Sequence, residues 1–511
     1  MFAFLKLLKS GRYSMNVQAN RNSNLPKKQI TNHISSNLSK NIDTLHQIFQ
    51  QIPDLVNRQF QTLNKLDVSL VYLSGLTDKQ FIYNNILNPL MNKEFDPSKG
   101  LPVTIGELQI ITTWDQFETA IFEGDSVLFI NGQNLGYQLN TKGWPQRDIS
   151  DPKNEISLKG ANQGFIETSS QNIALIRRYI PNRELVIKEF SIGNSSKTKA
   201  SILYLRDIAS QEILQELETR IQNINVESII NTGELVEFIE DNPYSPFPQL
   251  LLTERPDVTA FQIFQGKFAI VVDRCPHVLI APTSFISFFQ GVDDYNTRWL
   301  VASLIRLLRF LGFSISLFLP ATYVAFISYN FEVIPMQLYL SIAESRIQVP
   351  FLPVMEALLM EITLEMMKEA ALRLPAPIGQ TIGIVGGIVI GQAAVQAGIV
   401  SNIMIIVVAV TAIASSLVPN YDMSLAIRLL RFPMMLLAAL FGIVGIVIGW
   451  MIIIAHLICL NSLGTPYGIP LTPFRFSGMK DFFFRLPLWL MKKSKTKNVT
   501  AKRQENTSDK G

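Results

Sequence analysis

The segment FLPVMEALLMEITLEMMKEAALRLPAPIGQTIGIVGGIVIGQAAVQAG, residues 351–398, joins an acid-bearing helix to a glycine-rich apolar run. It lies inside a hydrophobic block that extends from about residue 300 to residue 460. Glu361, Glu365 and Glu369 recur every four residues, so they lie on one face of a helix. Carboxylates are costly inside a membrane and usually mark functional positions there. The segment therefore predicts a membrane domain that handles ions or a polar ligand.

The composition of the 511-residue chain changes along its length. Residues 1 to about 297 carry evenly spread charge, residues 300–460 are mostly apolar, and the end of the chain is basic. A chain of this length holds about three domains. The net charge of +4, without a basic and aromatic patch, argues against a nucleic-acid partner.

The pattern predicts an α/β soluble N-terminal region of two small mixed subdomains, followed by an all-α transmembrane domain. We expect about four crossings plus one amphipathic acid-bearing helix. The first residues are rich in Asn, Ser, Gln and Lys, which favours disorder. The expected parts are a disordered lead-in (1–40), α/β subdomain 1 (41–208), α/β subdomain 2 (209–297), the transmembrane domain (298–475) and a basic cytoplasmic tail (476–511).

Two β-hairpins are predicted in the soluble region. SVLFING and GQNLGYQL flank an Asn-Gly pair that suits a turn, and FQIFQGKFAIVVDRCPHVLIAP suggests a second hairpin around Gln265 and Gly266. The sequence has no Walker loop, no GxGxxG after a strand and no nucleophile elbow. Cys275 and Cys459 form no metal-ligand spacing. We therefore expect no enzyme, no cofactor and no metal site.

Four membrane spans are expected by length, at residues 300–329, 378–400, 403–418 and 433–460. MFAFLKLLKSGR is interrupted by Lys6 and lacks a small-residue cleavage site, so it does not resemble a signal peptide. Basic residues before the first span and after the last favour the cytoplasm for both termini. Arg428 and Arg431 would then lie on the outer side, which counts against this topology.

The acidic face predicts a pore if several copies surround an axis. Rings of carboxylate would select cations, and a ring of aliphatic side chains would gate by dewetting. The pore-lining candidates are Val354, Leu358, Glu361, Glu365 and Glu369. Ordinary helix ion pairs with Lys368 and Arg373, or an amphipathic helix at the membrane interface, explain the same pattern. Glu356 points away from this face and is expected to be a packing or interfacial group.

The glycine-rich run predicts close helix packing, because small residues let helices approach in lipid. Its members are Gly379, Gly383, Gly386, Gly387 and Gly391. They suit either an oligomer contact or packing within the chain. A glycine-broken transporter helix is a rival, although no second half repeats the pattern. Pro375 and Pro377 are hinge candidates, and His456 is expected to be a hydrogen-bonded structural group.

Several long stretches resemble one family. They include DRCPHVLIAPTSFISFFQGVDDYNTRWLVASLIRLLRFLGFSISLFLPATYVAF, the run from VPFLPVMEALLMEITLEMMKEAALRLP to GIVS, VVAVTAIASSLVPNY and LNSLGTPYGIPLTPF. These resemble the A subunits of GerA-type spore germination receptors over most of residues 60–475. Lys368 and Ala371 depart from the family's usual REAGLRLP, which cautions against transferring the exact pore geometry.

The resemblance implies an integral membrane protein of the spore inner membrane, with the α/β subdomains on the cytoplasmic side. It implies that the chain acts together with a transporter-like B subunit and a lipoprotein C subunit in the response to nutrients. It also implies a homo-oligomer, a pentamer, that forms a nutrient-gated ion channel with the helix at residues 353–374 near the pore.

Three functions remain open from the sequence. The first is a subunit of a ligand-gated cation channel that opens when the helix at residues 353–374 shifts. The second is a non-conducting scaffold or signal transducer that docks a permease-like partner. The third is a secondary transporter, which an internal inverted repeat would favour.

Overall fold

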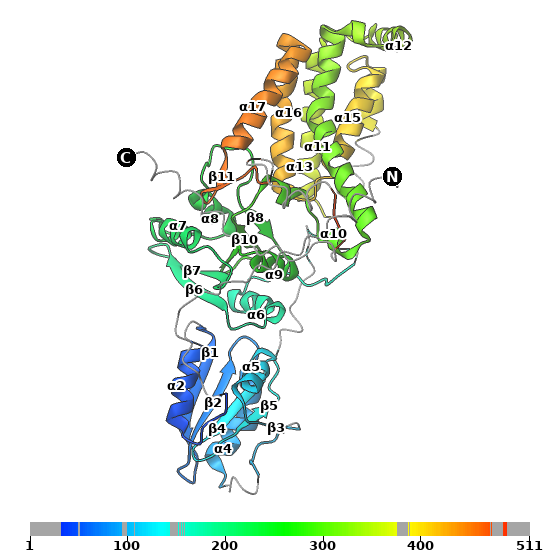
Figure 1. The fold of residues 1–511 in the computed structure, drawn as a ribbon. Helices are drawn as coiled ribbons and strands as arrows, with labels where there is room; N and C mark the ends of the chain where they lie inside the picture. Colours follow the sequence, from blue (N-terminus) through cyan, green and yellow to red (C-terminus); the bar gives the residue numbers. More distant parts are fainter. Residues whose placement is uncertain are drawn as a thin grey trace, which may run out of the picture.

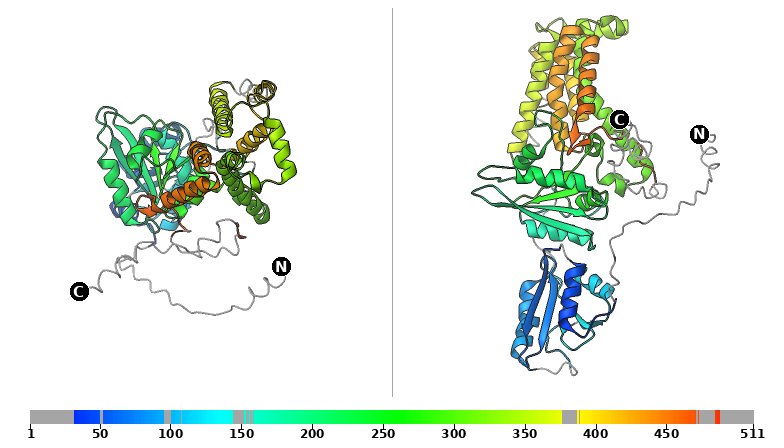
Figure 2. Two further views of the ribbon diagram at one scale, coloured as in Figure 1. Left: turned by 90° about the horizontal axis from the view of Figure 1, so that it is seen from above. Right: turned by 60° about the vertical axis from the view of Figure 1, so that its left-hand side comes forward.

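The computed structural model describes residues 32–49, 52–94, 100–106, 108–143, 152, 155, 157, 159–375, 387, 389–470, 472 and 484–487. Two α/β units and a helical bundle lie one after another along the molecule (Figure 1). The same stacking is visible from the side in Figure 2. The expected fold class, an α/β region followed by an all-α region with apolar helices, is confirmed.

The first unit is a five-stranded antiparallel sheet with the order β1-β2-β4-β5-β3. Its elements are α2 (Leu38–Ile48), β1 (Leu55–Gln61), β2 (Asp67–Leu73), α3 (Lys79–Ile82), a π-helical turn (Tyr83–Leu87), α4 (Asn88–Asn92), β3 (Leu108–Ile111), α5 (Trp114–Phe122), β4 (Ser126–Ile130) and β5 (Gly136–Leu139). α2 and α5 pack on one face, where Trp114, Phe117 and Phe129 form an aromatic cluster. α3 and α4 cover the other face.

The second unit repeats this plan. Its sheet has the order β6-β7-β9-β10-β8, which is the order of the first sheet in the same sequence of elements. The elements are α6 (Ser169–Tyr179), β6 (Leu185–Ile192), β7 (Thr198–Leu205), α7 (Gln211–Gln222), α8 (Thr232–Ile239), β8 (Leu251–Thr253), α9 (Pro256–Phe264), β9 (Phe268–Val272) and β10 (Val278–Ala281). α6 and α9 cover one face, and α7 and α8 cover the other.

The predicted boundaries of the α/β subdomains need correction. β6 and β7 belong to the second sheet, because β7 pairs with β9 along Ala200–Leu203, so the boundary between residues 208 and 209 is too late. The disordered lead-in is also too long, since α2 begins at Leu38 and Ile34 is buried beside it. Asn37 caps α2 by accepting hydrogen bonds from its first backbone N–H groups. Residues 1–31 lie outside the described part of the chain.

One of the two predicted hairpins is confirmed. β4 and β5 pair across the loop that contains the Asn-Gly pair. The second hairpin is β9–β10, but its turn lies at residues 273–277 and not at Gln265 and Gly266. Gly266 instead ends α9, with a φ of +84° that suits a glycine after a helix.

The helical part begins with α10 (Asp293–Asn296) at the base. The other helices are α11 (Trp299–Ser328), α12 (Met336–Arg346), α13 (Pro353–Arg373), α15 (Asn402–Ser415), α16 (Tyr421–Phe441) and α17 (Ile443–Cys459). α11 and α16 are long and apolar enough to cross a membrane, and α15 and α17 are shorter apolar helices. α12 lies at the end of the bundle away from the α/β units (Figure 1).

The membrane spans expected from the sequence agree only in part with the helices of the structure. Residues 300–329 correspond to α11 and residues 403–418 to α15, whereas residues 378–400 fall partly outside the described residues. Residues 433–460 do not form one span, because the chain reverses at Gly442 between α16 and α17. α13 packs against α11, α15 and α16 as a member of the bundle.

After α17 the chain returns to the second α/β unit. β11 (Asn461–Ser462) and β12 (Thr465–Pro466) form a small ladder there. The fully buried Tyr467 donates its hydroxyl to the Pro248 carbonyl at 2.7 Å, and Ser462 donates to the Gln249 carbonyl at 2.7 Å. The membrane domain therefore does not extend to residue 475. Of the expected tail, only residues 484–487 are described, and Arg485 there is buried against α10.

His456 is a hydrogen-bonded structural group, as expected, because its Nε2 lies 2.8 Å from the Ser245 hydroxyl. Its ring also stacks on Phe247. These contacts join α17 to the loop before β8.

We predict that Gly445→Val destabilises the α16–α17 pair. A Cβ at Gly445 would overlap the carbonyl oxygen of Leu437, so the helices would have to separate. Overpacking of this kind costs about 1–3 kcal/mol. Thermal unfolding of the detergent-purified chain measures the loss. Gly106→Ala is the control, because a Cβ there meets nothing within 4 Å. Equal midpoints for the two variants would contradict the hairpin packing.

A second prediction concerns pH. Burial raises the pKa of Glu240 from 4.5 to about 7, against a lowering by a hydrogen bond from the Gln249 backbone. The folded state therefore binds a proton that the unfolded chain releases. The stabilisation is complete below about pH 4.5 and is lost as the pH rises through about 7. Glu240→Gln should remove this part of the pH dependence of the unfolding midpoint. If the unfolding midpoint of the variant depended on pH as that of the wild type does, the role assigned to Glu240 would be contradicted.

Candidate functional site

The glutamates of α13 do not share one free face of the chain. Glu361 is fully buried and forms an ion pair with Arg431 of α16, which is also buried. Arg431 further donates to Ser316 of α11, at 3.0 Å to its carbonyl and 2.9 Å to its hydroxyl. A buried charge needs such a partner and additional hydrogen bonds. This pair therefore joins three helices at the centre of the bundle.

A second ion pair lies one helical turn further along α13. Glu365 accepts from Arg428 at 2.8 Å, and both side chains are largely buried. Lys368 donates to the Ser415 hydroxyl of α15 at 3.2 Å, and not to Glu365 as the helix spacing suggested. We call the two α13–α16 pairs, Glu361–Arg431 and Glu365–Arg428, the ion-pair ladder.

Glu369 is the exposed member of the acidic series. It pairs with Arg373 at 2.7 Å within α13, as the four-residue spacing predicted. Its side chain is 60% exposed and that of Arg373 is 79% exposed. Such a pair contributes little stability, so Glu369 is available to other partners.

Glu356 is confirmed as a packing group, near the other end of α13. It is fully buried and accepts from the Ser401 backbone N–H at 2.6 Å and from the Ser401 hydroxyl. Arg346 of α12 lies 3.3 Å from its other oxygen, and Tyr323 of α11 donates to that oxygen at 3.4 Å. Glu356 thus fixes α12, α13 and the start of α15 to α11.

The aliphatic pore candidates Val354 and Leu358 also face the inside of the bundle. Val354 and Leu358 are half-buried and pack against the core of the bundle. The large apolar residues of α13 that are exposed are instead Met355, Leu359, Ile362, Met366 and Leu372. The first four follow one another at intervals of four, three and four residues, so they form a stripe along the helix.

Much of the glycine-rich run lies outside the described residues, including Pro377, Gly379, Gly383 and Gly386. Gly391 lies beside Ile405 of α15, where a Cβ would be 3.7 Å from its side chain. A Cβ at Gly387 would meet nothing within 4 Å. Pro375 is exposed just after α13. Among the described glycines of this run, Gly391 therefore packs against another helix of the same chain.

Sequence reasoning missed the partners of the glutamates. In the four-span topology the outer-side position of Arg428 and Arg431 was an objection, and in the structure both side chains point into the bundle. Their spacing of three in an otherwise apolar helix, opposite carboxylates spaced by four, is the signal that identifies them. No such signal marks Ser316, Tyr323 or Ser401, since their roles depend on tertiary contacts.

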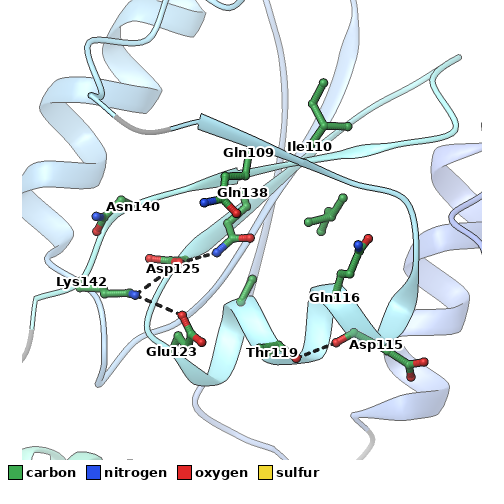
Figure 3. Close-up of a pocket in the computed structure, with 12 residues that line it drawn as sticks. Gln109, Ile110, Asp115, Gln116, Thr119, Glu123, Asp125, Gln138, Asn140 and Lys142 are labelled. Carbon is green, nitrogen blue, oxygen red and sulfur yellow. Dashed lines mark hydrogen bonds and ion pairs between the residues drawn. The ribbon is translucent and has the colours of Figure 1, made fainter.

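The first unit also has a polar groove on its surface. It has a volume of about 440 Å³ and lies between α5, β3 and β5 (Figure 3). Lys142 lies 3.2 Å from Glu123 and 3.7 Å from Asp125, and Gln138 donates to Asp125 at 2.6 Å. Burial raises the pKa of Asp125 despite these partners. These ionic groups pair with one another across the groove.

Comparison with known proteins extends these observations. The family model described as Bacillus/Clostridium GerA spore germination protein matches residues 43–497. The chain is 39% identical to the uncharacterized membrane protein YfkQ of Bacillus subtilis (strain 168), covering 90% of each chain. It is also 39% identical to spore germination protein KA of the same organism, covering 89% of this chain and 86% of that one.

One solved structure is also similar. It is the N-terminal domain of the A subunit of the Bacillus megaterium spore germinant receptor GerK3, at 29% identity and a TM-score of 0.38, covering 50% of this chain and 98% of that one. The apolar helices α11 and α16, together with the match to a membrane protein, make this chain membrane-associated. The match over residues 43–497 decides the family: the chain belongs to the Bacillus/Clostridium GerA spore germination proteins.

Proposed function

We propose that this chain is a subunit of a nutrient-responsive germination receptor and that several copies form a cation channel in the spore inner membrane. Family membership supports a germinant-receptor role. The resemblance to A subunits supports a pentamer, a transporter-like B subunit and a lipoprotein C subunit as partners, and cytoplasmic α/β units. The conducting path would run along α13.

The observation that carries the channel proposal is the exposed face of α13. Met355, Leu359, Ile362 and Met366 are 53%, 42%, 48% and 60% exposed. Their alternating spacing of four and three is the one by which helices pack around a common axis. In a ring of copies they would form an aliphatic constriction, with the exposed carboxylate of Glu369 at its end. Such a constriction gates by dewetting, and a carboxylate ring favours cations.

The ion-pair ladder suggests how α13 would move. Its carboxylates are spaced by four residues and its arginines by three, on helices that run in opposite directions. A shift of α13 by four residues, about 6 Å, would pair Arg431 with Glu365 and Arg428 with Glu369. Both registers keep two α13–α16 ion pairs, and in the second register Glu361 would lose its partner. The third glutamate of the series is needed only for the second arrangement.

The alternative is a non-conducting scaffold or signal transducer that docks a permease-like partner. One observation favours it: the pore-lining candidates Glu361 and Glu365 are neutralised by arginines of the same chain. They would then hold the helices together without meeting ions. Electrical recording separates the two proposals.

We predict that Ile362→Ser raises the basal cation current of the purified oligomer several-fold in planar bilayers. A hydroxyl in the constriction would allow water to enter it. Ile452→Ser on α17 is the matched control, because Ile452 is similarly exposed, at 60%, but lies off the α13 stripe. Glu369→Gln should lower the preference for cations. Equal currents in the two serine variants, or no current from the wild type with its partner subunits, would favour the scaffold.

We also predict that Glu361→Gln destabilises the bundle strongly, because Arg431 would remain buried without its charge partner. Breaking such a pair costs about 3–5 kcal/mol. Glu369→Gln, which breaks an exposed pair, should cost less than about 1 kcal/mol. The double variant Glu361→Gln/Arg431→Met should recover part of the loss. Thermal unfolding of the detergent-purified chain measures all three. A similar small effect for both glutamates would refute the central role of the buried pair.

A further inference from the structure

The chain enters the two α/β units by the same hydrogen bond. The backbone N–H of Phe165, four residues before α6, donates to the Glu254 carbonyl after β8 at 2.8 Å. The backbone N–H of Ile34, four residues before α2, donates to the Thr112 carbonyl after β3 at 3.0 Å. Therefore α2 corresponds to α6, and the end of β3 corresponds to the end of β8.

A side-chain contact supports this correspondence. Asn41 of α2 accepts from the Ser35 backbone N–H at 2.9 Å and donates to the carbonyl of the same residue at 2.6 Å. Asn172 of α6 does the same with Ile166, at 2.9 Å and 2.5 Å. Because α2 begins at residue 38 and α6 at residue 169, a position before α2 corresponds to the position 131 residues later.

In the second unit, the chain that precedes α6 lies against the end of β8 and the start of α9. Glu155 accepts from the Thr253 hydroxyl at 2.6 Å and from the Glu254 backbone N–H at 2.9 Å. Arg255 donates to the carbonyls of Glu155 and Ala161, at 3.1 Å and 2.8 Å. The edge of the second sheet is therefore covered here by chain that comes before its first helix.

The groove between α5, β3 and β5 is the corresponding place in the first unit (Figure 3). Counted from Thr112 and from Glu254, equivalent positions line the two places: Gln109, Asp115, Gln116, Thr119 and Ala120 in the first unit, and Leu251, Asp257, Val258, Phe261 and Gln262 in the second. Glu155 and Ala161 also line the second place, and their counterparts before α2 are Asn24 and Ile30. Among the described residues, none that precedes β3 lines the groove of the first unit.

The charge of the groove is opposite to that of the chain before α2. The groove is lined by the three carboxylates of Asp115, Glu123 and Asp125 and by one ammonium group, that of Lys142. Residues 1–31 contain six basic residues and no acidic residue: Lys6, Lys9, Arg12, Arg21, Lys27 and Lys28. A basic segment would therefore meet a complementary surface in the groove.

The described chain begins at the edge of this groove. The Asn32 side-chain amide donates to Asp115 at 2.9 Å, and the Trp114 backbone N–H donates to the Asn32 carbonyl at 2.9 Å. An extended chain advances about 3.4 Å per residue, so Lys27 lies within about 17 Å of Asn32. At about 1.5 Å per residue, α5 covers about 12 Å between Asp115 and Glu123. The lysines can therefore reach the far end of the groove.

We propose that residues 24–31 of this chain dock in the groove between α5 and β3, with Lys27 and Lys28 beside Glu123 and Asp125. The first unit has Thr113 where the second has Arg255, so contacts between lysine and carboxylate replace the hydrogen bonds of Arg255. Docking covers the exposed edge of β3, which would otherwise be able to pair with another strand. The docking does not depend on the chain being a channel.

The test is the rate at which N-ethylmaleimide modifies a single cysteine in the detergent-purified full chain, with Cys275 and Cys459 replaced by alanine. Thr119→Cys places the thiol in the groove. Thr219→Cys on α7 is the matched control, because both threonines are exposed and donate to the carbonyl four residues earlier. We expect Lys27→Glu/Lys28→Glu to speed the reaction of Thr119→Cys at least tenfold and to leave that of Thr219→Cys unchanged.

A charge reversal in the groove tests the same contact from the other side. The Glu123 side chain is 54% exposed, so Glu123→Lys should fold normally. It should also speed the reaction of Thr119→Cys, and adding Lys27→Glu/Lys28→Glu to it should restore part of the protection. Three outcomes would overturn the proposal. They are an equally fast reaction with and without the lysine changes, an equally slow one, which would place a second copy or another chain in the groove, and no recovery in the combined variant.

Discussion

The buried ion pair between Glu361 and Arg431 is the interaction on which the helical bundle depends. Neither charge is stable alone in an apolar layer, so each helix that carries one must lie beside the other. Ser316 adds two hydrogen bonds from α11 and so fixes the third helix. The acidic helix is therefore held inside the bundle by electrostatics, and its apolar stripe is left facing outward. The channel proposal rests on that division of the helix into a paired face and a free face.

The α/β region and the bundle form one connected structure. A single hydrophobic cluster extends from the α6–α9 face of the second sheet through Phe288 and Phe289 to α11. The return of the chain after α17, anchored by Tyr467, closes the same junction from the other side. The first unit is joined by Arg177, which is fully buried and lies 2.9 Å from Asp54. The second α/β unit is thus joined to α11 and α16 by one continuous set of packed side chains.

The sequence predicts those parts of the fold that local patterns determine. The order of the α/β region and the helical region, the β4–β5 hairpin and the Glu369–Arg373 pair each follow from composition, turn residues or helical spacing. Long-range pairing is not visible in this way. The junction of β7 with β9, the repeat of the sheet order and the return of residues 461–470 depend on partners far along the chain. The burial of Glu361 could not be predicted for the same reason. Helical spacing shows which residues share a face of α13, but it does not show which helix packs against that face.

Cysteine accessibility along α13 tests the central claim most directly. Cys275 and Cys459 would first be replaced by alanine, and single cysteines then introduced at Leu359, Ile362, Ala357 and Met360. A membrane-impermeant thiol reagent is applied to the reconstituted oligomer while its current is recorded. The account predicts that Leu359→Cys and Ile362→Cys react and lose current, whereas Ala357→Cys and Met360→Cys, at buried positions, do not. Reaction and block at the two buried positions alone would contradict the division of α13 into a paired face and a pore face.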